Sequence, residues 1–216
     1  KYEYWRFYFR TLAASGTPLY LVSAIFRPDQ IFFRWYGGFF RETLQCVTYF
    51  FTQNQESLEL LADIGITQAS LAGDTRFDRV AGLPLQRKPI PEVEIFTADR
   101  PVLVAGSTWP ADEAILAELH RQFPDWAVII APHEIQESHL TAIEKLFTKS
   151  IRFSTLSQLS TVTGQMSERP TVLIIDNIGM LSSLYAYGQT AYIGGGFGAG
   201  IHNTLEAATY GIPVIF

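Results

Sequence analysis

The sequence predicts an α/β fold made of two domains, each with a parallel, Rossmann-like sheet. Two observations favour this class. Short apolar runs typical of strands alternate with amphipathic segments of helical period along most of the chain. Residues 190–216 read as strand, glycine cluster, polar step, short helix and second strand. Strands that are joined through helices in this way are parallel, because the connection has to cross back to the starting edge.

Composition and charge narrow the class further. The chain has 216 residues, of which 48% are hydrophobic and 17% charged, as in a soluble globular protein with a substantial core. The formal net charge of −5 argues against a general nucleic-acid partner. The only cysteine is Cys46, so no internal disulfide can form, which is typical of a reducing cytoplasm. The long uncharged runs are interrupted by glycine or proline, so no transmembrane helix is predicted.

Residues 1–80 are predicted to form the later part of an N-terminal domain. The apolar periods indicate helices at 5–14, 38–46 and 55–64 and strands at 19–24, 47–51 and 69–71, with Asn54 as the cap of the third helix. Residues 81–101 contain Pro84, Pro89, Pro91 and Pro101 and have no usable period. This stretch is therefore predicted to be a linker between domains.

Residues 102–216 repeat the alternation and are predicted to form a second domain. Its strands are expected at 102–105, 127–131, 151–153, 172–175, 191–193 and 213–216, and its helices at 109–122 or 110–122, 137–147, 180–187 and 204–209. In open parallel sheets, ligands bind beyond the carboxyl ends of the strands. Four polar or glycine-rich loops leave those ends, so we expect them to share one rim: 106–108, 132–135, 176–180 and 194–203.

The glycine-rich loop is the strongest candidate site. Five glycines lie within residues 194–200, where free backbone N–H groups can approach an anion closely. The loop lacks the G-x-G-x-x-G spacing of dinucleotide sites. Asn203 and Glu206, three positions apart, also fit a helix capping box that binds no ligand. Spacing alone leaves both interpretations open.

The other candidate positions have plain alternatives too. Ser107 or Thr108 fits the cap of the helix that follows, and His133, Glu134 and His202 fit ordinary loop residues.

Residues 1–51 carry a charge of +3 and 17 of the 30 aromatic residues. Interleaved basic and aromatic residues are typical of a surface beside lipid headgroups, but aromatic residues also fill cores.

Four motifs in the chain resemble a known family. They are GDTRFDRV at 73–80, VLVAGSTWPADE at 102–113, IIAPHE at 129–134 and GGGFGAGIHNTLEAATYGIPVIF at 194–216. Together they resemble the bacterial 3-deoxy-D-manno-octulosonic acid (Kdo) transferases of lipopolysaccharide synthesis, and the last motif is the most specific.

The resemblance implies a two-domain glycosyltransferase of the GT-B type. Such an enzyme transfers Kdo from CMP-Kdo to a lipid A precursor at the cytoplasmic face of the inner membrane, with which it makes peripheral contact. It needs no metal and no cofactor, and the sequence contains no Asp-x-Asp pair. Helix N-termini and backbone N–H donors would then neutralise the charge of the leaving CMP phosphate.

The resemblance also suggests roles for individual residues. Asn203 matches the asparagine at the phosphate, and Glu206 matches the glutamate on the ribose hydroxyls. The other positions carried over as nucleotide-binding are Ser107, Pro132, His133, Gly179, Gly195 and Gly196. The chain departs from the family's pattern in two loops: Pro132-His133-Glu134 stands where Pro-Arg-His is common, and Gly179-Met180-Leu181 stands where Gly-Glu-Leu is common.

The general base is expected to lie before Lys1, and Glu3 matches a further acidic residue near the acceptor cleft. The chain opens without methionine and closes on an apolar run, so we expect a segment of a longer protein that does not catalyse transfer by itself. The alternatives are a GT-B transferase or epimerase that uses a uridine nucleotide, and a non-catalytic nucleotide-sugar-binding or membrane-docking module.

Overall fold

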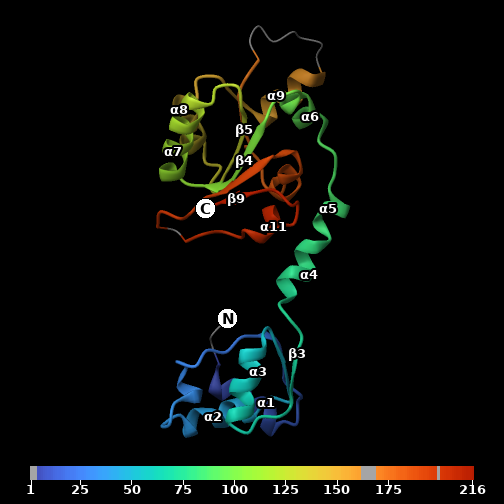
Figure 1. The fold of residues 1–216 in the computed structure, drawn as a ribbon, viewed down its shortest axis with the longest axis vertical. Helices are drawn as coiled ribbons and strands as arrows, with labels where there is room; N and C mark the ends of the chain where they lie inside the picture. The colour runs from blue at the N-terminus through green and yellow to red at the C-terminus, as the bar shows by residue number, and fades with distance from the viewer. Residues whose placement is uncertain (1–3, 162–168, 199) are drawn as a thin grey trace. The chain divides into compact units, whose positions relative to one another are not determined.

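The computed structural model describes residues 4–161, 169–198 and 200–216. The chain divides into two compact units, Lys1–Asp78 and Arg79–Phe216, called unit 1 and unit 2 below. Both contain a parallel sheet with helices, which confirms the predicted α/β class with two Rossmann-like sheets (Figure 1).

Unit 1 is built on a three-stranded parallel sheet in the order β1-β2-β3. The strands are β1 (Tyr20–Ala24), β2 (Tyr49–Thr52) and β3 (Ala69–Leu71), and the helices are α1 (Arg6–Ala14), η1 (Ile31–Phe33, a 3-10 turn), α2 (Gly38–Gln45) and α3 (Gln55–Asp63). Asn54 caps α3 as predicted, because its Oδ1 accepts from the N–H of Ser57 at 3.0 Å. The core contains Phe26, Phe50 and Leu61, all fully buried.

Unit 2 is built on a six-stranded parallel sheet in the order β6-β7-β5-β4-β8-β9. Its strands are β4 (Val102–Thr108), β5 (Ala127–Pro132), β6 (Ser150–Arg152), β7 (Val172–Ile174), β8 (Thr190–Ile193) and β9 (Val214–Ile215). Its helices include α7 (Pro110–Gln122), α8 (Glu137–Leu146), α9 (Phe153–Thr161), α10 (Leu181–Leu184), η2 (Tyr185–Tyr187, a 3-10 turn) and α11 (Leu205–Ala208).

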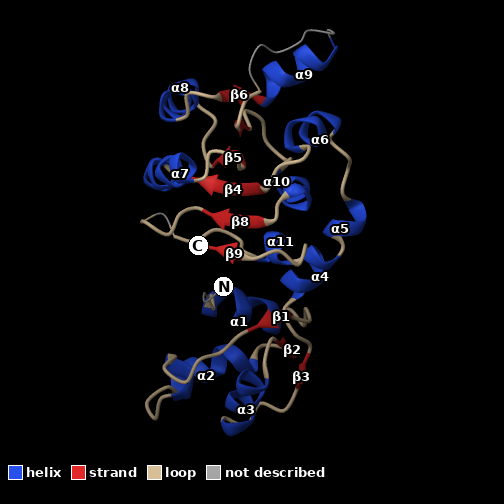
Figure 2. Cartoon of the chain, turned by 45° about the horizontal axis from the view of Figure 1, so that its top comes forward, coloured by secondary structure: helices blue, strands red, loops and turns tan. Residues whose placement is uncertain are grey.

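Both faces of this larger sheet are covered. Helices α7 and α8 lie on one side of the strands and α10 and α11 on the other (Figure 2). Alternate residues of β4 therefore enter different cores: Leu103 packs in the cluster that contains Leu116 and Ile143, whereas Val104 packs in the other. Burial on both faces explains why the central strands read as continuous apolar runs.

The predicted linker at 81–101 differs from what the structure shows. This stretch belongs to unit 2 and contains two helices, α5 (Leu83–Gln86) and α6 (Pro91–Thr97). Each helix has a proline at its first or second position, where the missing N–H is not needed. Val93 and Phe96 of α6 are buried in the core of unit 2. The prolines start helices here instead of marking a linker.

Two further elements were not predicted from the sequence. Helix α4 (Thr75–Ala81) follows β3, and the division between the units falls within it. Helix α9 begins directly after β6, where the sequence predicts only a strand. Among the helices that the structure describes, none is both long and apolar enough to cross a membrane.

Candidate functional site

The four loops singled out in the sequence leave the same edge of the unit 2 sheet. They follow β4, β5, β7 and β8, which are neighbours in the order β7-β5-β4-β8 and are all parallel. Backbone hydrogen bonds join them where the strands end: His133 N donates to Thr108 O at 2.9 Å, and Gly194 N donates to Gly106 O at 2.9 Å. The carboxyl edge of the sheet therefore holds one continuous rim.

Ser107 lies in an unusual backbone conformation on this rim. Its φ is +54°, in the left-handed region that side chains other than glycine rarely adopt, and the pairing of β4 with β5 shifts register between Gly106 and Thr108. Neither Ser107 nor Thr108 caps α7. The N-cap is Trp109, whose N–H donates to the carboxylate of Asp112 at 2.9 Å. The capping alternative for Ser107 is therefore wrong.

The carboxylate of Asp112 links several elements of the rim. The residue is 1% exposed, and its Oδ2 accepts from the N–H groups of Trp109 and of Gly195, the latter at 3.1 Å. Oδ1 accepts from the hydroxyl of Tyr192 at 2.6 Å. Burial, and then the hydrogen bond to Asp112, raises the pKa of Tyr192 and keeps it a donor. One buried carboxylate thus connects α7, β8 and the glycine loop.

Glycine is required at two positions of the loop. A Cβ on Gly194 would meet the carbonyl of Ser107 and the carboxylate of Asp112. Gly195 has a φ of +99°, and a Cβ there would meet the carbonyl of Gly200. Gly196 follows in a turn, where a Cβ would not be crowded. The first two glycines thus bring the loop against β4 and α7.

Three aromatic rings stack beside this loop. His133 stacks on Trp109 with ring centroids 4.7 Å apart, and on His202 with centroids 4.5 Å apart. The indole N–H of Trp109 donates to Nε2 of His202 at 3.2 Å, so this nitrogen is an acceptor and carries no proton. Burial, followed by the neighbouring His133, lowers the pKa of His202, which favours the same neutral form.

Asn203 and Glu206 contact each other but do not form the capping box considered above. Oδ1 of Asn203 accepts from the N–H of Leu205 at 3.1 Å, and its amide donates to Glu206 Oε1 at 3.1 Å. Helix α11 begins one residue later than a box requires, with Thr204 as an N-cap that makes no side-chain bond. Asn203 thus bonds the backbone of Leu205 and the side chain of Glu206, and the reciprocal bond of a capping box, from the N–H of Asn203 to Glu206, is not formed.

The remaining predicted positions are dispersed along the rim. Pro132 is the buried last residue of β5, and Gly179 lies in the loop after β7 with a φ of +96°. Glu3 lies outside the described residues. Within the described residues, no group of three or more His, Cys, Asp or Glu side chains could hold a metal ion.

A buried acid beside Asp112 was missed from the sequence. Glu113 is 1% exposed, accepts from the hydroxyl of Thr108 at 3.0 Å, and lies 2.9 Å from Nε2 of His139. The other ring nitrogen of His139 lies 2.9 Å from the carbonyl of Glu134. This chain of contacts supports the loop that carries His133. Spacing gives no signal for it, because residues 113 and 139 come together only when α7 and α8 pack side by side.

Comparisons with known proteins agree with the sequence motifs. Residues 1–79 match the family model described as 3-deoxy-D-manno-octulosonic-acid transferase (kdotransferase). A curated 3-deoxy-D-manno-octulosonic acid transferase from Rickettsia felis is 27% identical over 83% of this chain and 38% of its own length. The protein of the same name from Bordetella pertussis is 27% identical over 99% of this chain and 50% of its own length. These matches confirm the resemblance to Kdo transferases, and the chain spans half or less of each relative.

A solved structure supports the fold. A Listeria monocytogenes protein described as a UDP-N-acetylglucosamine 2-epimerase aligns with 95% of this chain and 52% of its own, with a TM-score of 0.55 and 12% identity. At this identity the similarity bears on the fold alone. It extends across both units, each of which has the α/β parallel-sheet architecture seen here.

Proposed function

We propose that this chain is part of a glycosyltransferase that moves Kdo from CMP-Kdo to a hydroxyl group of a lipid A precursor. The observation that carries the proposal is the similarity to Kdo transferases, which covers unit 1 through the family model and both units through the curated relatives. In this proposal unit 1 takes the acceptor and unit 2 takes the nucleotide sugar, as the resemblance implies.

The nucleotide would bind on the rim of unit 2. The N–H groups of Gly194 and Gly195 are held by Gly106 O and Asp112, so the phosphate of CMP would meet the later N–H groups of the glycine loop. Backbone N–H groups suit a phosphate without a metal ion. Asn203 and Glu206 bond to each other in this structure. CMP would replace that bond, with the amide of Asn203 turning to the phosphate and the carboxylate of Glu206 to the ribose hydroxyls.

Transfer also needs a base for the acceptor hydroxyl. The base must lie within hydrogen-bond reach of the proton that it removes. From the resemblance we expect it before Lys1. With the base in the N-terminal domain and the nucleotide on unit 2, each domain would supply one part of the reaction, as in a GT-B enzyme.

Unit 1 would contact the cytoplasmic face of the inner membrane. None of the side chains of α1, all of which the structure describes, is buried, and Phe7 on this helix is 83% exposed. Trp35 is 91% exposed. The guanidinium of Arg6 lies 3.7 Å from the centroid of the Phe39 ring and joins α1 to α2. Exposed rings beside basic side chains fit a layer of anionic headgroups.

The test is a calorimetric titration of the whole protein with CMP and, separately, with UDP. We expect CMP to bind more tightly, and Glu206→Gln to weaken CMP binding about 10-fold to 100-fold, because a charge-assisted hydrogen bond is lost. The melting temperature should not change, since Glu206 makes no capping bond in this structure. Tighter binding of UDP would favour the uridine alternative and contradict the proposal.

Product formation separates an enzyme from a binding module. The whole protein, incubated with CMP-Kdo and a lipid A precursor, should yield the Kdo-bearing lipid. CMP binding without any product under these conditions would leave the non-catalytic module as the better description.

A further inference from the structure

A pocket of about 370 Å³ lies wholly within unit 1, away from the residues used above. Its lining comes from the ends of all three strands: Ser23 near the end of β1, Gln53 directly after β2, and residues 74–76 after β3. Because the three strands are parallel, their carboxyl ends meet at one edge, which is where open α/β sheets bind ligands. The motif GDTRFDRV supplies the third part of the lining.

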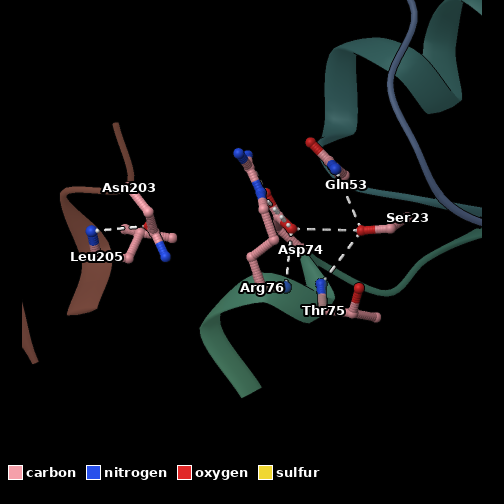
Figure 3. A network of polar contacts seen from close by, with 7 residues as sticks. All are labelled: Ser23, Gln53, Asp74, Thr75, Arg76, Asn203 and Leu205. Atoms are coloured by element: carbon pink, nitrogen blue, oxygen red, sulfur yellow. Dashed lines mark hydrogen bonds and ion pairs between the residues drawn. The ribbon is translucent and has the colours of Figure 1, made fainter. Parts of the chain in front are cut away.

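Ser23 is the centre of a hydrogen-bond network in this pocket (Figure 3). Its Oγ accepts from the amide of Gln53 at 3.1 Å and from the N–H of Thr75 at 3.1 Å, and donates to Asp74 Oδ1 at 3.4 Å. Its φ is +58°, and the pairing of β1 with β2 shifts register between Val22 and Ala24. A strained backbone at a strand end is characteristic of sites that position ligands.

The pocket contains a charged pair that is neutral overall. The side chain of Asp74 is 9% exposed and accepts from Nε of Arg76 at 2.8 Å, and also from the backbone N–H of Arg76 at 3.0 Å. The carboxylate of Asp74 is thus occupied by Ser23 and Arg76, and it fixes the guanidinium of Arg76, a planar group with several N–H donors, at the pocket.

The remaining walls are apolar. Leu21, Val22 and Ala24 of β1 line the pocket together with Tyr4. The ring of Tyr4 stacks on Phe26 of the core, with centroids 5.7 Å apart and an interplanar angle of 18°. This wall is therefore held rigidly by the packing of unit 1.

We propose that this pocket is a saccharide subsite, which holds one sugar ring through neighbouring hydroxyl groups. The volume lies within the range of small-molecule sites. A sugar ring has polar edges for Gln53, Thr75 and the Asp74–Arg76 pair, and apolar C–H faces for Val22 and Tyr4. The neutral pair favours hydroxyl groups over a charged group. The assignment to the sugar of the acceptor rests on the proposed function, but the subsite itself does not.

The test uses the whole protein and the glucosamine disaccharide of a lipid A precursor, freed of its acyl chains. Titration calorimetry measures the disaccharide and CMP separately. Asp74→Asn should weaken disaccharide binding about 10-fold or more, because the amide cannot keep the geometry of the ion pair. Thr75→Val tests the subsite without breaking the network, which uses only the backbone N–H of Thr75. The matched control is Glu118→Gln, which removes one acid from the exposed pair with Arg121 on α7.

The outcomes separate the subsite from the proposed function. Weaker disaccharide binding by Asp74→Asn and Thr75→Val, with CMP binding and the Glu118→Gln control unchanged, would support the subsite. Equal binding by the parent and both variants would overturn it, as would a parent that binds CMP and no disaccharide. A parent that binds the disaccharide and no CMP would keep the subsite and remove the proposed function.

Discussion

Two serines occupy equivalent places in the two units. Ser23 and Ser107 have φ values of +58° and +54°, and each lies at a register shift near the end of a strand, β1 in unit 1 and β4 in unit 2. Such a conformation costs about 1–3 kcal/mol at each position and persists only where the surrounding structure imposes it. Both strands end at a carboxyl edge that we assign to a ligand. Each of the two edges thus contains a serine in the left-handed conformation at a register shift.

Asp112 is the residue on which the unit 2 rim depends most. Its carboxylate accepts from three donors, the N–H groups of Trp109 and Gly195 and the hydroxyl of Tyr192. In Asp112→Asn one of these donors would face an NH₂ group, which cannot accept. We expect the free energy of unfolding to fall by about 1–3 kcal/mol, measured by denaturant titration. Hydrogen exchange at Gly195 should become faster.

Tyr192→Phe is the graded control for this prediction. It removes one donor and leaves the other two bonds of Asp112 in place, so its loss of stability should be smaller than that of Asp112→Asn. Asp112→Asn with the stability and the Gly195 exchange rate of the parent would contradict the role given to this carboxylate.

At the scale of elements, the sequence predicts strands better than connections. The strand at 69–71 was predicted to the residue, and the other predicted strands appear with small shifts at their ends. The central strands of unit 2 are easy to recognise, because their apolar runs are buried on both faces. The prolines of α5 and α6 were misleading, since proline is also common in the first turn of a helix. The rim loops followed from the alternation of elements. The Trp109–His133–His202 stack did not, because it depends on which strands are neighbours.

The element with the clearest surface role is α1, for which we predict membrane contact. Binding of the whole protein to vesicles with anionic lipid should fall as salt is raised, since basic side chains near the surface contribute about 1 kcal/mol each. Phe7→Ser and Trp35→Ser should each weaken vesicle binding about 10-fold or more, because an exposed ring loses its burial in the headgroup layer. Co-sedimentation measures both effects.

Arginine variants are less suitable for this test. Arg41 donates to the carbonyls of Phe32 and Arg34 at 2.8 and 3.0 Å. Replacing Arg41 would therefore disturb the segment that contains Trp35. Leu85→Ser is the matched control, because Leu85 is 91% exposed on α5 of unit 2. Phe7→Ser and Trp35→Ser variants that bind vesicles as well as the parent would show that these rings face another part of the protein.

At the scale of the whole molecule, the similarity to Kdo transferases rests on different matches in the two units. The family model matches residues 1–79, which include the whole of unit 1, whereas unit 2 is matched through the curated relatives. Unit 2 has the glycine loop and the rim, and unit 1 has the pocket around Ser23. A nucleotide site in one domain and a sugar site in the other would divide donor from acceptor.

Because the donor and acceptor sites would lie in different domains, we predict that the 216-residue chain binds CMP without catalysing transfer. The rim residues all belong to unit 2, so holding the phosphate of CMP needs no contribution from unit 1. Transfer needs the base that the resemblance places before Lys1, and losing such a base costs about 10² to 10⁴ in rate. We expect calorimetry to detect CMP binding, and a radiolabelled CMP-Kdo assay with a lipid A precursor to give no product. Product formed by the 216-residue chain alone would place the base within it, and Glu3 would be the first residue to replace.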